Sequence, residues 1–337
     1  MSYKLISKYR NELMGVALLW VILFHSCLPD FKSDSMYIKI IEYGFAFIKK
    51  TGYGGVDIFL LLSSFGLFYS LSSKKEFDLK EFYRKRLLRI MPTFICITLL
   101  YSIYLMYNNR LELIGVIYNV TTISYWFNMK EAVNWYIPSI LVFYLLTPVY
   151  YTMFISKKKK ELLTLTVCII GFGIGLIAIG MKAYYLVNFL ARIPIFFIGF
   201  LIGYYSKNNI EIKKSSFILY MLSLMIGLLI LGAMFTKIKN PYFRDYPFIL
   251  ITIPLSLLLA FIMEKLSLKY INSTLAILGK YSLEVYLLNV IFTREFATLN
   301  KYFVCSKNLI LYNVVVFMLT IIGAIIINKI ISKFISQ

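Results

Sequence analysis

Residues 11–27 read NELMGVALLWVILFHSC, an apolar run that ends close to the only histidine of the chain, His25. A transmembrane α-helix needs about 20 predominantly apolar residues, and several more runs of about this length follow. Ionisable side chains at membrane depth are costly and tend to line cavities or reaction paths. His25 is therefore a candidate functional residue. A histidine at the end of a span can also lie at the headgroup level and bond to water or a neighbouring helix.

The composition decides the class of protein. The chain is 60% hydrophobic and 15% charged, with a mean hydropathy of +0.76, whereas soluble domains are about 45–50% apolar and about 25% charged. The apolar runs are uninterrupted, while the strands of a membrane barrel would alternate. The sequence therefore predicts an all-α integral membrane protein, a polytopic bundle of about ten transmembrane helices.

The basic residues predict how the bundle is oriented. Lys4, Lys8 and Arg10 precede the first span, and Lys157 to Lys160 follow the fourth, as expected of segments on the cytoplasmic side. An even number of spans then places both termini in the cytoplasm. Residues 1–337 are expected to form a single transmembrane domain with no appended soluble domain. The expected spans are residues 11–28, 56–73, 92–107, 136–155, 161–180, 184–205, 216–235, 248–263, 275–292 and 309–331.

The formal charge of +20 does not indicate nucleic-acid binding. The basic residues form short clusters between the spans, which the positive-inside rule explains. The four cysteines, Cys27, Cys96, Cys168 and Cys305, lack the spacing of a metal site. They predict neither a metal site nor a disulfide framework.

Two further ionisable residues are predicted inside the bundle. Asp57 follows TGYGG at 51–55 and opens the second span, so it lies at the same end of the bundle as His25. It can also stabilise its helix N-terminus by about 0.3–1 kcal/mol. Arg192 lies about 12 Å along the sixth span and needs an acid, an anionic ligand or water. It either lines a cavity or forms a buried structural ion pair, and Pro194 loosens the helix beside it.

Two segments between spans are open to more than one interpretation. Residues 74–91, KKEFDLKEFYRKRLLRIM, either anchor the inner side or in part converge on a ligand, and Pro92 is expected to open the third span. Residues 108–134 are aromatic and semi-polar, with Trp126 and Trp135 at interfacial positions. They could fold over a site as a re-entrant or surface helix.

Five segments together resemble the membrane-bound acyltransferase 3 family, whose members O-acylate cell-envelope carbohydrates and some other acceptors. In chain order they are RNELMGVALLWVILFHS (10–26), GGVDIFLLLSSFGLFYSL (54–71), FYRKRLLRIMPTF (82–94), NWYIPSILVFYLLTPVYY (134–151) and LGKYSLEVYLLN (278–289). The resemblance implies an acyl-CoA donor on the cytoplasmic side and an acceptor on the outer side. It matches the family's histidine to His25, its VD-x-F motif to Val56, Asp57 and Phe59, its sixth-helix arginine to Arg192 and its tryptophan to Trp135.

Three positions depart from the family pattern. Where the family often has an arginine eleven residues before the histidine, this chain has Met14, and Arg10 lies one helical turn earlier. The first arginine of the family's R-x-x-x-R pair is Lys85, with Arg89 retained, and lysine lacks bidentate phosphate geometry. A late histidine of the family is replaced by Asn289, so chemistry that needs an imidazole must use His25.

The mechanism that this resemblance implies is acyl transfer with His25 as general base on the acceptor hydroxyl. Asp57, if it reaches the ring, would orient it. The residues expected at the substrate or oxyanion are Arg192, Trp135, Tyr286 and Asn289, with Arg192 and Tyr286 as the alternative oxyanion donors. The residues expected at the phosphates of acyl-CoA are Arg10, Lys85, Arg86 and Arg89. A covalent acyl-histidine is the alternative route.

The resemblance also sets expectations for ligands and location. Acyl-CoA, most simply acetyl-CoA, serves as cosubstrate, with no permanently bound cofactor and no metal. The partners are an envelope carbohydrate and the lipid bilayer, in a multi-pass protein of the cytoplasmic membrane of a bacterium. A transporter or flippase of an envelope glycan precursor is the alternative function, since ten spans with a buried charged site describe many carriers. A structural membrane subunit would not require His25 or Arg192.

Overall fold

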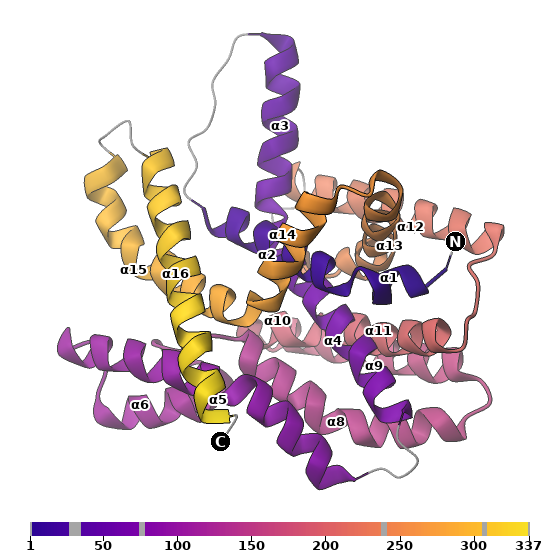
Figure 1. Ribbon diagram of the computed structural model, residues 1–337, viewed down its shortest axis with the longest axis horizontal. Helices are drawn as coiled ribbons and strands as arrows, with labels where there is room; N and C mark the ends of the chain where they lie inside the picture. The colour runs from indigo at the N-terminus through magenta and orange to yellow at the C-terminus, as the bar shows by residue number, and fades with distance from the viewer. Residues whose placement is uncertain (1, 27–34, 74–77, 237–240, 305–308, 336–337) are drawn as a thin grey trace.

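The computed structural model describes residues 2–26, 35–73, 78–236, 241–304 and 309–335. These residues are almost entirely helical and form no β-strand beyond an isolated bridge between Ser2 and Glu211. Figure 1 shows most of the helices gathered into one bundle. Their bounds are α1 Lys4–Lys8, α2 Arg10–His25, α3 Met36–Lys50, η1 Gly52–Gly54, α4 Gly55–Ser72, α5 Leu79–Tyr107, α6 Leu113–Val120, α7 Ile123–Trp126, α8 Tyr136–Ser156, α9 Lys160–Gly180, α10 Tyr184–Leu190, α11 Ile193–Lys207, α12 Lys214–Thr236, η2 Pro241–Phe243, α13 Phe248–Leu266, α14 Lys269–Lys280, α15 Ser282–Val304 and α16 Leu309–Ile335.

The predicted class, an all-α polytopic membrane protein, is confirmed. Within the described ranges, eight helices are long and apolar enough to cross a membrane, and α14 with the first part of α15 makes a ninth if this pair, bent by 72°, is one span. The first expected span corresponds to α2, which has 16 residues and so extends about 24 Å. The cytoplasmic location of the termini stays a prediction.

Several boundaries differ from those expected. Pro92 lies inside α5 and does not begin it, because Asp78 caps the helix 14 residues earlier by accepting from the backbone N–H groups of Lys80 and Glu81. The basic stretch from Leu79 is therefore helical and continuous with the third span. Residues 108–134, for which a re-entrant or surface helix over a site was one interpretation, contain the short helices α6 and α7.

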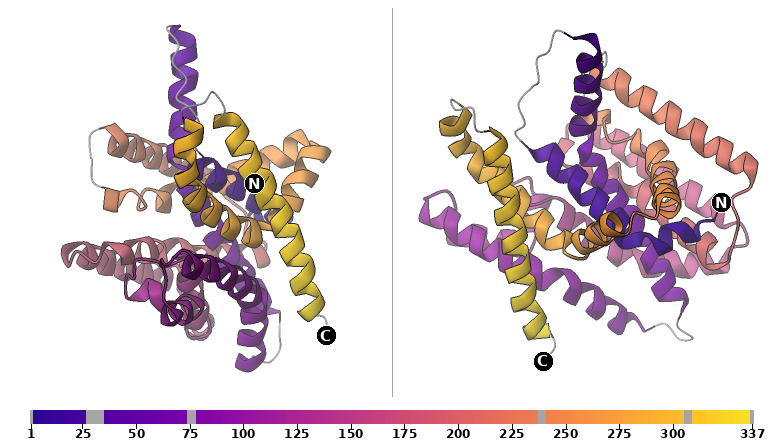
Figure 2. Two further views of the ribbon diagram at one scale, coloured as in Figure 1. Left: turned by 90° about the vertical axis from the view of Figure 1, so that its left-hand side faces the viewer. Right: turned by 45° about the horizontal axis from the view of Figure 1, so that its top comes forward.

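The segment between the first two expected spans contains α3, which projects away from most of the other helices in Figure 1 and in the left view of Figure 2. Cys96 and Cys168 are free thiols. Cys27, Cys305, Lys74 and Lys75 lie outside the described residues.

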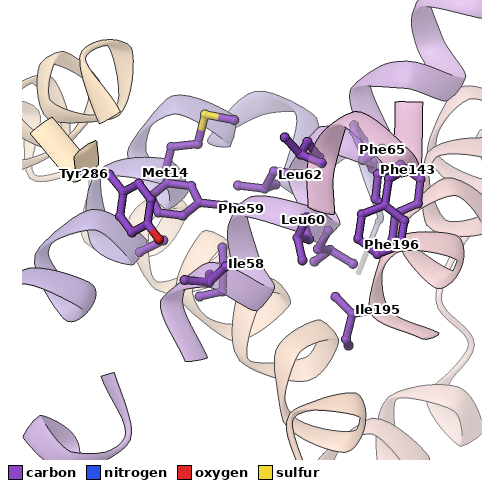
Figure 3. Packing of buried hydrophobic residues seen from close by; sticks show 14 of the residues in the cluster. Met14, Ile58, Phe59, Leu60, Leu62, Phe65, Phe143, Ile195, Phe196 and Tyr286 are labelled. Carbon is purple, nitrogen blue, oxygen red and sulfur yellow. The ribbon is translucent and has the colours of Figure 1, made fainter. Parts of the chain in front are cut away.

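The centre of the bundle is α4, which packs against α2, α8, α11 and α13. Small residues bring α4 and α11 close together: a Cβ on Gly199 would meet Ser64 and the backbone of Leu61, the kind of contact that favours helix association in lipid. Aromatic rings fill the space beyond, with Phe143 and Phe196 stacked at a centroid distance of 4.4 Å (Figure 3). The core therefore holds α4 rigidly where it meets α2 and α11.

A second close approach joins α14 to α2. A Cβ on Gly279 would meet the backbone carbonyl of Asn11, and a Cβ on Gly15 would meet the backbone of Leu275. Neither neighbour can move without separating the two helices.

We expect Gly279→Ala to lower the thermal unfolding midpoint in detergent, since the added methyl group must separate α14 from α2. Gly173→Ala is the matched control, because Gly173 lies within α9 and a Cβ there has no neighbour within 4 Å. Its expected change is a gain of about 0.5–1 kcal/mol from the loss of glycine in a helix. Equal midpoints for the two variants would contradict this packing.

Candidate functional site

Arg192 occupies a break between two helices. Helix α10 ends at Leu190 and α11 begins at Ile193, with Pro194 in the first turn, where a proline removes no helical hydrogen bond. The break places Arg192 immediately before α11, with an exposed fraction of 1%. A guanidinium this deeply buried must be paired.

Arg192 forms ion pairs with two buried carboxylates, those of Asp245 and Asp57. It also lines a cavity that is described below. Its two terminal nitrogens face Asp245, with Nη1 3.1 Å from Oδ2 and Nη2 3.4 Å from Oδ1, a bidentate geometry. Nη2 also lies 3.6 Å from Asp57 Oδ2, and Nη1 donates to the Asn188 carbonyl at 2.9 Å. The ring of Trp135 covers the guanidinium at 4.6 Å. Both roles expected for Arg192 therefore coexist.

No hydrogen bond joins Asp57 to His25 in the described part of the chain; Asp57 pairs with Arg192. The expected contact, in which Asp57 orients the ring of His25, is therefore not found among the described residues; a backbone carbonyl bonds to the ring instead. His25 Nδ1 lies 2.9 Å from the carbonyl oxygen of Val21. A carbonyl can only accept, so Nδ1 carries the proton in this bond, and Nε2 of the neutral ring is left as an acceptor. The geometry leaves the ring with one basic nitrogen.

His25 lines a cavity of about 280 Å³, which we call the His25 cavity. Three other residues predicted from the sequence, Trp135, Arg192 and Tyr286, line it too. Burial raises the pKa of Tyr125, another lining residue, so its phenol is neutral, and it donates to the Tyr185 carbonyl at 3.0 Å. The remaining lining residues are Val21, Phe24, Tyr53, Val56, Ala132, Val133, Asn134, Asn188, Arg244, Asp245 and Val290.

The segment before α8 forms one wall of the His25 cavity, and hydrogen bonds from α15 hold this segment in place. Arg294 donates to the carbonyls of Ala132 and Lys130 and to the carboxylate of Glu131, the last at 3.0 Å. Glu131 also faces Arg110 at 3.6 Å. These bonds fix the backbone that carries Asn134 and Trp135 into the cavity.

A second cavity, of about 70 Å³, has a basic character; we call it the Arg89 cavity. Arg10 and Arg89 line it, and the lining that the structure describes includes no Asp or Glu. Met14, Phe59 and Tyr286 belong to its less polar part and lie side by side in Figure 3. The other lining residues are Val56, Ser63, Ile90, Tyr136, Tyr144, Ser282 and Leu283.

Of the four residues expected to bind acyl-CoA, two line the Arg89 cavity and two do not. Arg10 and Arg89 line the Arg89 cavity. Arg86 lies outside the lining with its guanidinium 5.6 Å from the ring centre of Phe82. Lys85 lies on the surface and pairs with Glu81 at 2.6 Å.

Asn289 and Asp57 line neither cavity. Asn289 is 2% exposed, and its Oδ1 accepts no hydrogen bond from the described residues. Sequence reasoning missed Asp245 and Asn134. An acid next to an arginine in the segment before α13 was the available signal for Asp245.

The two cavities meet at Val56 and Tyr286, the residues that line both. The bend between α14 and α15 at Tyr281 brings Ser282, Leu283 and Tyr286 to this place. A basic cavity and a cavity with an imidazole thus adjoin across one aromatic side chain. This arrangement can hold an anionic group on one side and a proton acceptor on the other.

Comparison with known proteins gives one match. The family model described as an acyltransferase domain, that of the acyltransferase 3 family, matches residues 13–329. No curated protein and no solved structure matches the chain. Because the match covers nearly the whole sequence, this multi-pass membrane protein belongs to the acyltransferase 3 family and is an acyltransferase.

Proposed function

We propose that the protein transfers an acetyl group from acetyl-CoA to a hydroxyl of an extracytoplasmic carbohydrate, with His25 as general base. The observation that carries the proposal is the junction of the two cavities at Val56 and Tyr286. A donor held in one cavity and an acceptor held in the other would bring their reacting groups together at this junction.

The Arg89 cavity suits the donor. Its two guanidiniums are the groups that bind phosphates best, since each can donate two parallel hydrogen bonds. With no acid in the described lining, two cations at one cavity favour an anion such as the phosphates of CoA. We propose that these lie at Arg10 and Arg89 and that the thioester extends past Met14 and Phe59 toward Tyr286.

The His25 cavity suits a neutral acceptor. Its charges are balanced, because the lining residues Arg192 and Arg244 face Asp245 in the lining and Asp57 behind it. The aromatic rings of Tyr53, Tyr125 and Trp135 line it and offer apolar faces to a sugar. Nε2 of His25 is an acceptor positioned to take the proton of a hydroxyl as that hydroxyl attacks the thioester carbonyl.

The orientation of this reaction follows the charge pattern of the sequence. We propose that the Arg89 cavity opens to the cytoplasm and the His25 cavity to the outside of a bacterial cytoplasmic membrane. The direct transfer proposed here needs no permanently bound cofactor.

The proposal is tested with purified protein in detergent, isotopically labelled acetyl-CoA and purified envelope glycans. We expect release of CoA thiol and label in the glycan in equal amounts. Bound glycan without thioester turnover would contradict the proposal and favour the carrier function.

Within this assay, Arg89→Ala is expected to raise the KM for acetyl-CoA about 10- to 100-fold, the effect of losing charged hydrogen bonds to phosphate. Arg84→Ala is the matched control, because Arg84 is an exposed arginine of the same helix and lines neither cavity. Equal KM values for the two variants would contradict the donor site.

A further inference from the structure

Asn134 is held in one orientation by the start of α8. Its Oδ1 lies 2.7 Å from the backbone nitrogen of Tyr136 and 3.1 Å from that of Ile137. Backbone N–H groups only donate, so the side-chain atom facing them must be the amide oxygen. The other end of the amide, Nδ2, is then a donor.

The donor end of Asn134 reaches Tyr286. Nδ2 lies 3.3 Å from the phenol oxygen Oη. Because an NH₂ group cannot accept, Oη must be the acceptor in this bond, and Tyr286 keeps its own proton for another acceptor. No hydrogen bond among the described residues takes that proton. The start of α8 therefore fixes the orientation of the Asn134 amide, and this orientation makes the phenol of Tyr286 a hydrogen-bond donor.

The position of Tyr286 gives this donor a role. The side chain is 5% exposed and lines both cavities. A thioester that extends from the Arg89 cavity toward His25 must place its carbonyl beside this phenol. Negative charge develops on the carbonyl oxygen during acyl transfer, and a preoriented donor in a site with little water stabilises it.

Arg192, the alternative donor, is already engaged. Its terminal nitrogens face Asp245, Asp57 and the Asn188 carbonyl, and only Nε lacks a hydrogen bond within the described structure. Arg192 lines the His25 cavity but not the Arg89 cavity. The junction that the thioester must reach is therefore occupied by Tyr286.

We propose that Tyr286 is the oxyanion donor of the acyl transfer and that Asn134 is the positioning residue that orients its proton. This inference rests on the proposed function. In the reaction, the acceptor oxygen forms a bond to the thioester carbon and its proton passes to His25 Nε2. The carbonyl oxygen becomes an oxyanion that accepts from Tyr286. The C–S bond then breaks, the carbonyl re-forms, and the leaving thiolate takes the proton from the imidazolium.

Two near-isosteric variants test the proposal. Tyr286→Phe removes the donor, and we expect kcat to fall about 100- to 1000-fold, the effect of losing one oxyanion donor, with the KM for acetyl-CoA unchanged. Asn134→Asp keeps the tyrosine and caps α8 as well as asparagine does. Its second oxygen can only accept and so takes the phenol proton. We expect a comparable fall in kcat with an unchanged unfolding midpoint.

The control is Tyr150→Phe. Tyr150 lines neither cavity, and its phenol oxygen lies 2.8 Å from the hydroxyl of Thr164. The kcat of this variant should match that of the wild type. The double variant Tyr286→Phe with Asn134→Asp should be no slower than Tyr286→Phe alone, because both changes remove one hydrogen bond.

Three results would overturn the proposal: wild-type kcat in Tyr286→Phe, wild-type kcat in Asn134→Asp, or a double variant whose losses multiply. Each requires an active wild-type enzyme. Absence of wild-type turnover would instead contradict the proposed function, so the two failures are distinguishable.

Discussion

Turnover of acetyl-CoA is expected to fall about 100- to 10,000-fold when His25 is replaced by glutamine. The imidazole has one basic nitrogen, Nε2, because its other nitrogen donates to the Val21 carbonyl. A glutamine amide keeps a polar group of similar reach but cannot take a proton near neutral pH. The measurement is the initial rate of labelled glycan formation by wild type and His25→Gln at the same protein concentration.

Loss of fold must be separated from loss of the base. We expect His25→Gln to keep the unfolding midpoint and the KM for acetyl-CoA of the wild type. Among the described residues the ring bonds only to its own helix, and the Arg89 cavity is untouched. An undiminished rate would contradict general base catalysis by His25. Acyl label on His25 when the donor is supplied without acceptor would replace it with the covalent route.

The second large effect concerns stability. Arg192→Met is expected to destabilise the protein by about 3–5 kcal/mol, the effect of breaking a buried pair by removing one partner. Asp57 and Asp245 would then both be buried with no guanidinium between them; they are 1% and 3% exposed. The measurement is the unfolding equilibrium in detergent, followed by circular dichroism.

Two further variants make this prediction specific. Lys8→Met removes an exposed partner of Glu264 and should leave stability almost unchanged. Adding Asp57→Asn and Asp245→Asn to Arg192→Met should recover part of the loss, because the uncompensated carboxylates disappear. Wild-type stability in Arg192→Met, or no recovery in the triple variant, would show that the carboxylates are not buried against Arg192.

Much of this site could be predicted from the sequence. An imidazole and a guanidinium inside apolar spans are costly enough to indicate a cavity, and His25 and Arg192 do line one. Trp135 and Tyr286 were predicted from the family resemblance, and they line the same cavity as His25 and Arg192. The basic residues of α5 were predicted as a group, but only helical phase and packing decide that Arg89 faces a cavity while Lys85 faces Glu81.

The rest depended on contacts between distant parts of the chain. Asp57 was expected at His25 because both lie at the same end of neighbouring helices, yet helix ends do not fix where side chains point. Asp245 meets Arg192 across 53 residues, and no local pattern predicts that contact. Asn134 has no local signal in the sequence; its role arises from its cap on α8 and its bond to Tyr286.

In the proposed reaction, donor and acceptor enter from opposite faces of the membrane and react at His25. The direct measurement uses sealed vesicles with acceptor glycan trapped inside, labelled acetyl-CoA added outside, and protein whose Arg10 end faces outward. We expect label in the trapped glycan, and we expect this label to be lost in vesicles that carry His25→Gln. Labelling only when glycan and acetyl-CoA share the same side would contradict the proposed reaction.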